Sequence, residues 1–315
     1  MHGPSSSVGP AGQITMLRGL HFSSWVEARD TKLDGMEVLA GTSGFSYPEW
    51  RGLFYPRELP DSSMLAYYAE RLPSVEINNT FYRMPKPELL TGWGAQVAPN
   101  FCFTLKASRT ITHLQKLAGV ADAVAHLFSV AEALTDKLGA ILFQLPPFVK
   151  KDVGLLREFL GTLPSTRHSV LEFRHPSWFA DDVYTALSDA RVALCAGDLD
   201  ELEKSPPLVV TAPFGYLRLR RLDYDVKLIT DWAERVAAQS WQRAYVYFKH
   251  EQLGPFFAQT LLAGLRGEPL PDLASVRASL PPVSGAAKAK SARPRASKAA
   301  PARTSRAPRK KPDDK

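Results

Sequence analysis

Six charged side chains stand where short apolar runs of the sequence turn polar. They are Glu76, Lys106, Glu172, Arg174, Asp198 and Arg218. A carboxylate or guanidinium inside a protein is costly unless an opposite charge neutralises it. The set therefore indicates either an ion-pair network, in which Glu172 and Asp198 neutralise Arg174 and Arg218, or a polar active site. We favour the active site for the set as a whole, because barrel interiors are usually filled by aliphatic residues.

These residue types suit an enzyme that acts on a small anionic or polyhydroxylated substrate. The guanidinium and ammonium groups would hold a phosphate or carboxylate, and the carboxylates would act as general acid or base. Two imidazoles would carry a second proton. The candidate catalytic residues are Glu76, Glu172, Asp198, His113 and His175. Hydrolysis or isomerisation is expected ahead of redox chemistry, because the sequence carries no nucleotide-binding motif.

Short motifs for other chemistries are missing from the sequence. GTSG at residues 41–44 is not the GxSxG of a serine hydrolase, so Ser43 is interpreted as a loop hydroxyl. His250 and Glu251 are followed by Gly254 where a zinc-binding HExxH motif has its second histidine. The catalytic candidates carry oxygen and imidazole groups, which bind divalent ions. Because such residues are common and these are spread through the chain, they are only weak evidence for a metal site. We predict no metal site, and no cofactor is assigned from the sequence.

Eight short apolar or β-branched runs recur between residues 37 and 280, with stretches of helical periodicity between them. The predicted strands are VLAGTS (38–43), SVEINN (74–79), FCFTLK (101–106), AILFQL (140–145), SVLEFR (169–174), VALCAG (192–197), FGYLRLR (214–220) and AYVYFKH (244–250). Alternating strands and helices imply parallel pairing. Eight such units in about 250 residues are typical of a single α/β (β/α)₈ barrel. An open doubly wound sheet is the alternative, but its glycine-rich phosphate turn is missing.

Some helical stretches carry their own start signals. Asp61 is predicted to cap a helix that stops at Pro73, and Asp152 is predicted to cap another. A third helix is predicted over residues 226–236 from its apolar spacing. Because reactive groups of barrel enzymes gather at the carboxyl ends of the strands, and side chains alternate between the two faces of a strand, the charged set is expected at the barrel mouth.

Composition divides the chain into three regions. Residues 1–36 are predicted to be a disordered extension, residues 37–280 the barrel domain, and residues 281–315 a disordered tail of Ala, Lys, Arg and Pro. The net charge is +7, but residues 285–315 hold eleven Lys or Arg against two Asp. The basicity therefore belongs to the tail, and the barrel is close to neutral.

The location of the protein is predicted from what its sequence does not contain. No run approaches the roughly 20 apolar residues that span a bilayer, and the first 35 residues do not have the pattern of a secretory signal. Cys102 and Cys195 stand inside apolar runs without a CxxC pair and are interpreted as buried thiols of a reducing compartment. The cytoplasm is therefore expected, with no membrane partner.

Several blocks of the sequence resemble the signature blocks of the YecE-like family, also described as domain of unknown function 72. The blocks are GTSGFSYPEWRGLFYP (41–56), YYAERLPSVEINNTFYRMP (67–85), FCFTLKASRTITH (101–113), LFQLPP (142–147) and LEFRHPSW (171–178). The resemblance covers about residues 38–265. It implies a (β/α)₈ barrel of a family that is widespread in bacteria and archaea and whose activity is not established.

The resemblance also implies a set of polar positions. They are Glu76, Asn78, Thr80, Tyr82, Arg83, Lys106, His113, Gln144, Glu172, Arg174, His175, Trp178 and Asp198. The predicted substrate-binding residues are Asn78, Tyr82, Arg83, Lys106, Gln144, Arg174, Trp178 and, from the strand pattern, Arg218. The sequence departs from the family pattern at two places. Arg220 and Arg221 stand where the family has His and Gly, and Lys249 and His250 stand where it has two Asn. Either this protein binds a different ligand from typical members of the family, or its activity has changed.

Two other functions stay open at this point. The basic tail could neutralise several phosphates, so a nucleic-acid-associated protein, such as a metal-assisted phosphodiesterase, is the second hypothesis. Tails of this kind more often bind any polyanion weakly. The third hypothesis is a barrel that binds a ligand or partner without catalysis, and the altered ends of the last two strands motivate it.

Overall fold

The computed structural model describes residues 32–33 and 35–280. The disorder predicted for the amino-terminal extension and for residues 281–315 lies outside the described residues, apart from a few positions. Two of these, Lys32–Leu33, form strand β1, which pairs antiparallel with β2. Two residues of the predicted extension are therefore part of the sheet.

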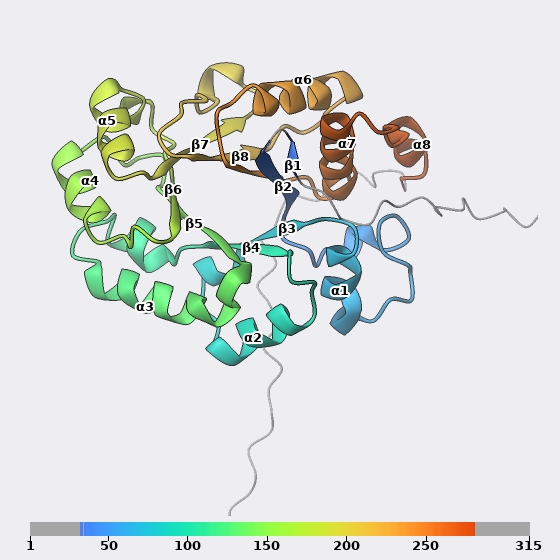
Figure 1. Ribbon diagram of the computed structural model, residues 1–315, viewed down its shortest axis with the longest axis horizontal. Coiled ribbons are helices and arrows are strands. Elements are labelled where there is room, and N and C mark those ends of the chain that lie inside the picture. Colours follow the sequence, from blue (N-terminus) through green and yellow to red (C-terminus); the bar gives the residue numbers. More distant parts are fainter. Residues whose placement is uncertain (1–31, 34, 281–315) are drawn as a thin grey trace, which may run out of the picture. The chain divides into compact units, whose positions relative to one another are not determined.

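Eight parallel strands close into a barrel, as the sequence predicts (Figure 1). They are β2 (Met36–Ser43), β3 (Ser74–Ile77), β4 (Cys102–Lys106), β5 (Leu138–Gln144), β6 (His168–Glu172), β7 (Ala193–Asp198), β8 (Phe214–Leu219) and β9 (Arg243–Phe248). Each strand pairs with the next along the chain, and β2 pairs with β9 from Glu37↔Arg243 to Thr42↔Phe248, which closes the ring. The strand bounds agree with the predicted runs to within two residues.

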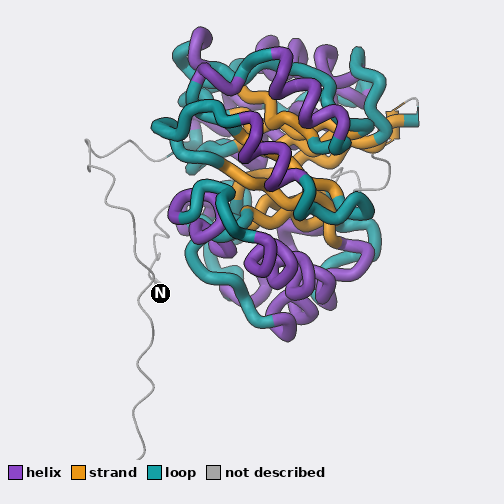
Figure 2. The backbone as a smooth tube through the Cα atoms, turned by 90° about the vertical axis from the view of Figure 1, so that its left-hand side faces the viewer, coloured by secondary structure: helices purple, strands orange, loops and turns teal. Residues whose placement is uncertain are grey.

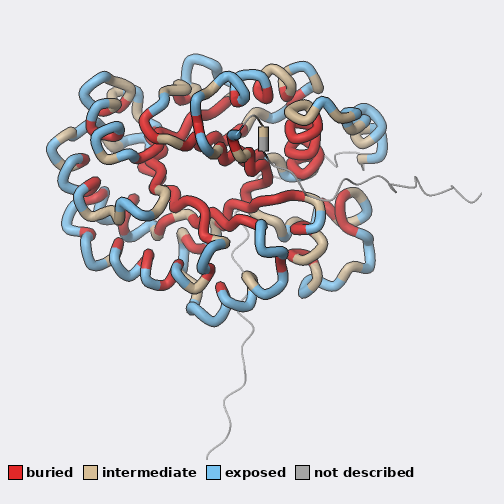
Figure 3. The backbone as a smooth tube through the Cα atoms, viewed as in Figure 1, coloured by how far each residue is buried: buried red, intermediate tan, exposed pale blue. Residues whose placement is uncertain are grey.

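The α-helices surround the strands (Figure 2). They are α1 (Met64–Ala69), α2 (Pro87–Ala95), α3 (Ala121–Ala131), α4 (Val153–Leu160), α5 (Asp181–Asp189), α6 (Val226–Ala237), α7 (Gly254–Arg266) and α8 (Leu273–Ala278). The connection from β7 to β8 departs from the expected strand–helix alternation, because its only helical segment is the 3₁₀ turn Leu202–Lys204. Figure 3 shows buried backbone along the strands and exposed backbone on the outer side of the helices.

The predicted helix starts are confirmed at one position and wrong at another. The Asp152 side chain accepts a hydrogen bond from the Leu155 amide at 3.0 Å and caps α4. Asp61 does not cap α1, because it opens a 3₁₀ turn and its carboxylate pairs with Arg51 at 2.5 Å. The ion pair takes the carboxylate away from the backbone amides that it was expected to bind.

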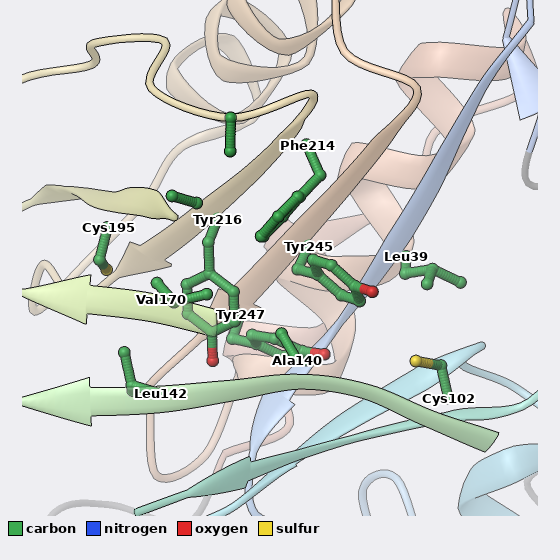
Figure 4. Close-up of a cluster of buried hydrophobic side chains, with 12 residues drawn as sticks. Leu39, Cys102, Ala140, Leu142, Val170, Cys195, Phe214, Tyr216, Tyr245 and Tyr247 are labelled. Carbon is green, nitrogen blue, oxygen red and sulfur yellow. The ribbon is translucent and has the colours of Figure 1, made fainter. Parts of the chain in front are cut away.

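Four aromatic rings lie in the interior of the barrel. Phe214, Tyr216, Tyr245 and Tyr247 are buried there among small and aliphatic side chains (Figure 4). The Tyr247 hydroxyl forms hydrogen bonds with the hydroxyls of Ser74 (2.6 Å) and Thr104 (2.8 Å). Rings therefore fill the barrel, and their polar atoms are paired inside it.

Both cysteines are unpaired and buried, which confirms the interpretation of their apolar surroundings. Cys102 lies on β4 and Cys195 on β7 (Figure 4). Among the described helices, none has the length and apolar character that a membrane span requires.

Candidate functional site

One buried guanidinium joins two buried carboxylates across the barrel. Arg218, near the end of β8, donates from Nη2 to Oε1 of Glu76 at 2.9 Å and from Nη1 to Oε2 of Glu172 at 2.7 Å. Glu76 is on β3 and Glu172 ends β6, so the three charges come from strands that are not neighbours. Both carboxylate side chains are fully buried, and only 4% of the Arg218 side chain is exposed. Period-two alternation explains why all three point inward.

Glu76 has further partners that keep it ionised. Its Oε1 accepts hydrogen bonds from Ser43 Oγ at 2.7 Å and Asn78 Nδ2 at 3.0 Å, and its Oε2 accepts one from the Tyr216 hydroxyl at 2.6 Å. Burial by itself would raise the pKa of Glu76, but Arg218 and the two hydroxyls lower that pKa below its usual value. Glu76 is therefore a fixed negative charge at neutral pH.

Glu172 is held in the same way by a different set of donors. Besides Arg218, its carboxylate contacts Gln144 Nε2 at 2.7 Å, Arg174 Nε at 3.3 Å and Arg220 Nη2 at 3.2 Å. Burial would raise the pKa of Glu172, and the three arginines together with Gln144 hold it well below its usual range.

Lys106 faces the same cluster without a carboxylate of its own. Its Nζ donates to Gln144 Oε1 at 2.8 Å and lies 4.4 Å from the centre of the Phe81 ring. Within the described part of the chain, no ion pair involves Lys106. Burial first, and then the positive charges of Arg218 and Arg174, lower the pKa of Lys106 to about 8. This amine therefore titrates close to neutral pH.

The cluster carries more positive than negative charge. Its cations are Lys106, Arg174, Arg218, Arg220 and Lys249. Burial and the neighbouring arginines also lower the pKa of Lys249, which directly follows β9. Among the described residues, the carboxylates that form ion pairs with members of this set are those of Glu76 and Glu172. The Nε atoms of Arg218 and Arg220 are buried without a hydrogen-bond partner in the described residues. The barrel mouth therefore carries an excess of positive charge.

His113 lies at the edge of the cluster. It is part of the π-helical turn Thr110–Leu114, where its Nδ1 is 2.9 Å from the Thr112 hydroxyl and its ring meets that of Phe81 edge-on. Burial lowers the pKa of His113, and the charges of Lys106 and Arg174 add to this effect. The imidazole is therefore neutral at physiological pH.

Asp198, predicted as a catalytic residue or as a partner of Arg174 and Arg218, is not brought into the cluster. Its Oδ2 accepts a hydrogen bond from Trp232 Nε1 of α6 at 3.0 Å, and Arg221 is 4.0 Å away. Gly197 pairs with Arg218 in the sheet, and Asp198 follows one residue later on the opposite face.

Two positions implied by the resemblance have local structural contacts instead. His175 Nδ1 accepts from the Ser177 amide at 3.1 Å and caps the 3₁₀ turn Pro176–Trp178. Trp178 is 2% exposed, stacks on Phe173 at 4.3 Å and donates from Nε1 to the Val149 carbonyl at 2.8 Å. A ligand at the mouth does not reach the Trp178 ring in this arrangement.

Tyr82 and Arg83 lie outside the cluster as well. Tyr82 is 72% exposed, and Arg83 is an exposed residue that lines a separate pocket with Leu89 and Trp93. The sequence predictions missed four members of the network. These are Ser43, Tyr216, Arg220 and Lys249. The alternation that identifies Arg218 also points to Tyr216 and Arg220, so that signal was present in the sequence.

No group of three or more His, Cys, Asp or Glu side chains in the described ranges 32–33 and 35–280 is arranged to hold a metal ion.

A closed ring of eight parallel strands with a polar cluster at their carboxyl ends defines a (β/α)₈ barrel protein. The family model described as protein of unknown function DUF72 matches residues 39–278, and the chain belongs to that family. The expectation drawn from the signature blocks is thereby confirmed.

Named relatives and solved structures agree with this assignment. The UPF0759 protein YecE of Escherichia coli K12 is 31% identical over 144 residues, which are 45% of this chain and 50% of YecE. The UPF0759 protein YunF of Bacillus subtilis is 29% identical over 142 residues, 41% of this chain and 49% of YunF. The chain thus spans about half the length of the curated relatives it matches.

Crystal structures of two DUF72 family proteins share the fold. The protein from Thermotoga maritima has a TM-score of 0.66 at 24% identity over 73% of this chain and 99% of its own. One from Enterococcus faecalis has a TM-score of 0.60 at 20% identity over 73% of this chain and 95% of its own.

Proposed function

We propose that this protein is an enzyme that binds a small anionic substrate at the barrel mouth and transforms it by acid–base chemistry. The observation that carries the proposal is the excess of cations, five against two carboxylates, around the carboxyl ends of the strands. An anion would complete this charge balance by pairing with the partly exposed guanidinium groups of Arg174 and Arg220.

Proton transfer is assigned to Lys106 and His113 rather than to the carboxylates. Glu76 and Glu172 are fully buried, and their lowered pKa values keep them ionised, so their role is to position Arg218. A proton carrier works best when its pKa is close to the working pH. The Lys106 pKa of about 8 meets this condition. His113 is neutral and contacts the same Phe81 ring as Lys106, which makes it a suitable acceptor. The reaction types that fit are hydrolysis and isomerisation.

Thermal unfolding of the full chain with inorganic phosphate, sugar phosphates and sugar acids tests the proposal. A bound anion at a hundred times its Kd adds about 2.7 kcal/mol of stability, or several degrees in Tm. Arg174→Ala should reduce this shift because Arg174 is at the mouth. Arg157→Ala, on α4 and paired with Asp189, is the matched control and should leave the shift intact. Equal shifts in both variants, or no shift with any anion, would contradict the proposal. A ligand recovered unchanged would make the protein a binder rather than an enzyme.

A second candidate function is association with nucleic acid, and the charge of one side of the mouth favours it. The loops after β3, β4, β5 and β6 (residues 78–86, 107–120, 145–152 and 173–180) contain seven Lys or Arg and one Asp. Tyr82 and Phe148 on these loops are 72% and 66% exposed. Basic loops with exposed aromatic rings suit single-stranded nucleic acid. Salt-dependent binding that survives removal of residues 285–315 would support this candidate, and binding that disappears with the tail would remove it.

A further inference from the structure

A pocket of about 540 Å³ opens beside the ion-pair cluster. The loops after β5, β6 and β7 and the end of β8 form its walls. Two of the lining residues, Arg174 and Arg220, approach the same oxygen of Glu172, at 3.3 and 3.2 Å. The cationic side of the pocket is therefore part of the barrel mouth, and the rest of the pocket extends away from it.

The remaining wall is mostly apolar. It is built from Pro147, Phe173, Pro176, Phe179, Leu199 and Pro206. Two further charges line the pocket, Glu203 and Lys204, and the Lys204 ammonium is paired with Glu201. Proline rings have a fixed backbone φ, and Phe173 is held in a parallel stack on Trp178 at 4.3 Å. The apolar wall is therefore formed before any ligand arrives.

We infer that the ligand of this mouth carries a flat apolar ring next to its anionic group, as an aryl phosphate or aryl carboxylate does. The inference rests on the proposed function and names the substrate class of the same site. A ring would bury apolar surface against the wall while its anion meets Arg174 and Arg220. A polyhydroxylated body would leave hydroxyls without partners against prolines and phenylalanines, which is costly. The sugar-like substrates predicted from the sequence are therefore the poorer fit.

Three probes that share one anion test this inference: inorganic phosphate, phenyl phosphate and glucose 6-phosphate, titrated calorimetrically into the full chain. Because each probe carries a phosphate, any contribution of the basic tail is common to all three. Phenyl phosphate should bind at least about tenfold tighter than inorganic phosphate, which corresponds to about 1.4 kcal/mol. Glucose 6-phosphate should gain nothing from its sugar.

Two phenylalanine variants locate the preference. Phe179→Ala should abolish the tenfold preference for phenyl phosphate and leave inorganic phosphate binding unchanged. Phe148→Ala is the matched control, since Phe148 is exposed on the loop after β5 but does not itself line this pocket. A preference that persists in Phe179→Ala would overturn the assignment to this pocket.

The outcomes separate the inference from the proposed function. If inorganic and phenyl phosphate bind equally, or glucose 6-phosphate binds tightest, the ring preference is wrong while the anion site stands. If none of the three binds, the anion site itself fails and the ring preference fails with it.

Discussion

Arg218 illustrates how one residue organises the mouth. Its guanidinium bridges two carboxylates that are fully buried. Desolvating three charges is expensive, and such clusters contribute little net stability compared with a well-packed apolar core. Their value here is geometric, because the triad fixes Glu76 and Glu172 in position, where Glu172 also pairs with Arg174 and Arg220.

Removing Arg218 should be far more damaging than removing Arg174, although both contact Glu172. Arg218→Met leaves two buried carboxylates without their partner, so we expect the free energy of unfolding to fall by about 3–5 kcal/mol. Arg174→Met removes a partner whose side chain is 35% exposed, so the loss should stay below about 1 kcal/mol. Urea unfolding at pH 7 measures both. Similar losses in the two variants would mean that the triad is not the central interaction.

Lys106 should react as an amine with a midpoint near pH 8. The rate at which an amine-specific reagent labels Lys106, followed by peptide mass spectrometry between pH 6 and 11, is expected to rise at that midpoint. Lys227 is exposed and paired with Asp231, which raises the pKa of its amine, and it serves as the reference. Coincident labelling curves for the two lysines would contradict the lowered pKa.

Side-chain alternation predicts much of the cluster from the sequence alone. Glu76, Glu172 and Arg218 each occupy an inward-facing position on a strand whose predicted bounds agree with the structure to within two residues. The error at Asp198 has the same origin, since one residue along a strand exchanges the two faces. The environment of Trp178 could not be predicted, because no local pattern distinguishes a ring stacked in the core from one at the mouth.

At the scale of elements, strands were easier to predict than their connections. Apolar and β-branched runs bounded by polar residues define a buried strand on their own. Whether a helix follows depends on the intervening residues, and the link between β7 and β8 contains Pro206 and Pro207. Proline disrupts a helix by removing a backbone donor and by restricting the residue before it. The two prolines could be seen in the sequence. The ion pair between Asp61 and Arg51, in contrast, has no signal in the sequence.

Gly41 on β2 should be irreplaceable for the packing of β2 against β3. A Cβ at this position would lie 1.9 Å from the Ser74 carbonyl oxygen and 2.9 Å from the Tyr68 hydroxyl. Gly41→Ala is therefore expected to lower the free energy of unfolding by more than about 2 kcal/mol. Gly92→Ala is the matched control, because a Cβ there meets nothing within 4 Å and helix α2 should gain up to about 1 kcal/mol. Denaturant unfolding of both variants measures these changes. An unchanged free energy of unfolding in Gly41→Ala would contradict the close packing of β2 against β3.

At the scale of the whole molecule, stability should fall in acid in two stages. His168 stacks on Phe214 at 3.9 Å, and burial together with Arg243 lowers its pKa to about 4. The unfolded chain binds this proton below pH 6.5, so stability is lost as the pH falls from 6.5 towards 4. Glu76 and Glu172 also have lowered pKa values, so their contribution is lost below about pH 4.5.

The first stage can be isolated by mutation. His168→Gln should flatten the pH dependence of the unfolding free energy between pH 6.5 and 4.5, a change on the order of 2 kcal/mol. His126→Gln, at an exposed position of α3, should preserve it. Urea unfolding across this pH range measures the slope. An unchanged slope in His168→Gln would assign the acid sensitivity to another group.

The two thiols inside the barrel make its opening measurable over time. Cys102 and Cys195 are 6% and 1% exposed, and burial raises the pKa of both, so a thiol reagent reacts only while strands are transiently apart. Because one thiol is on β4 and the other on β7, each reports on a different part of the ring. Equal labelling rates would mean that the barrel opens as one cooperative unit. A faster labelling rate at one cysteine would identify the part of the barrel whose strands separate first.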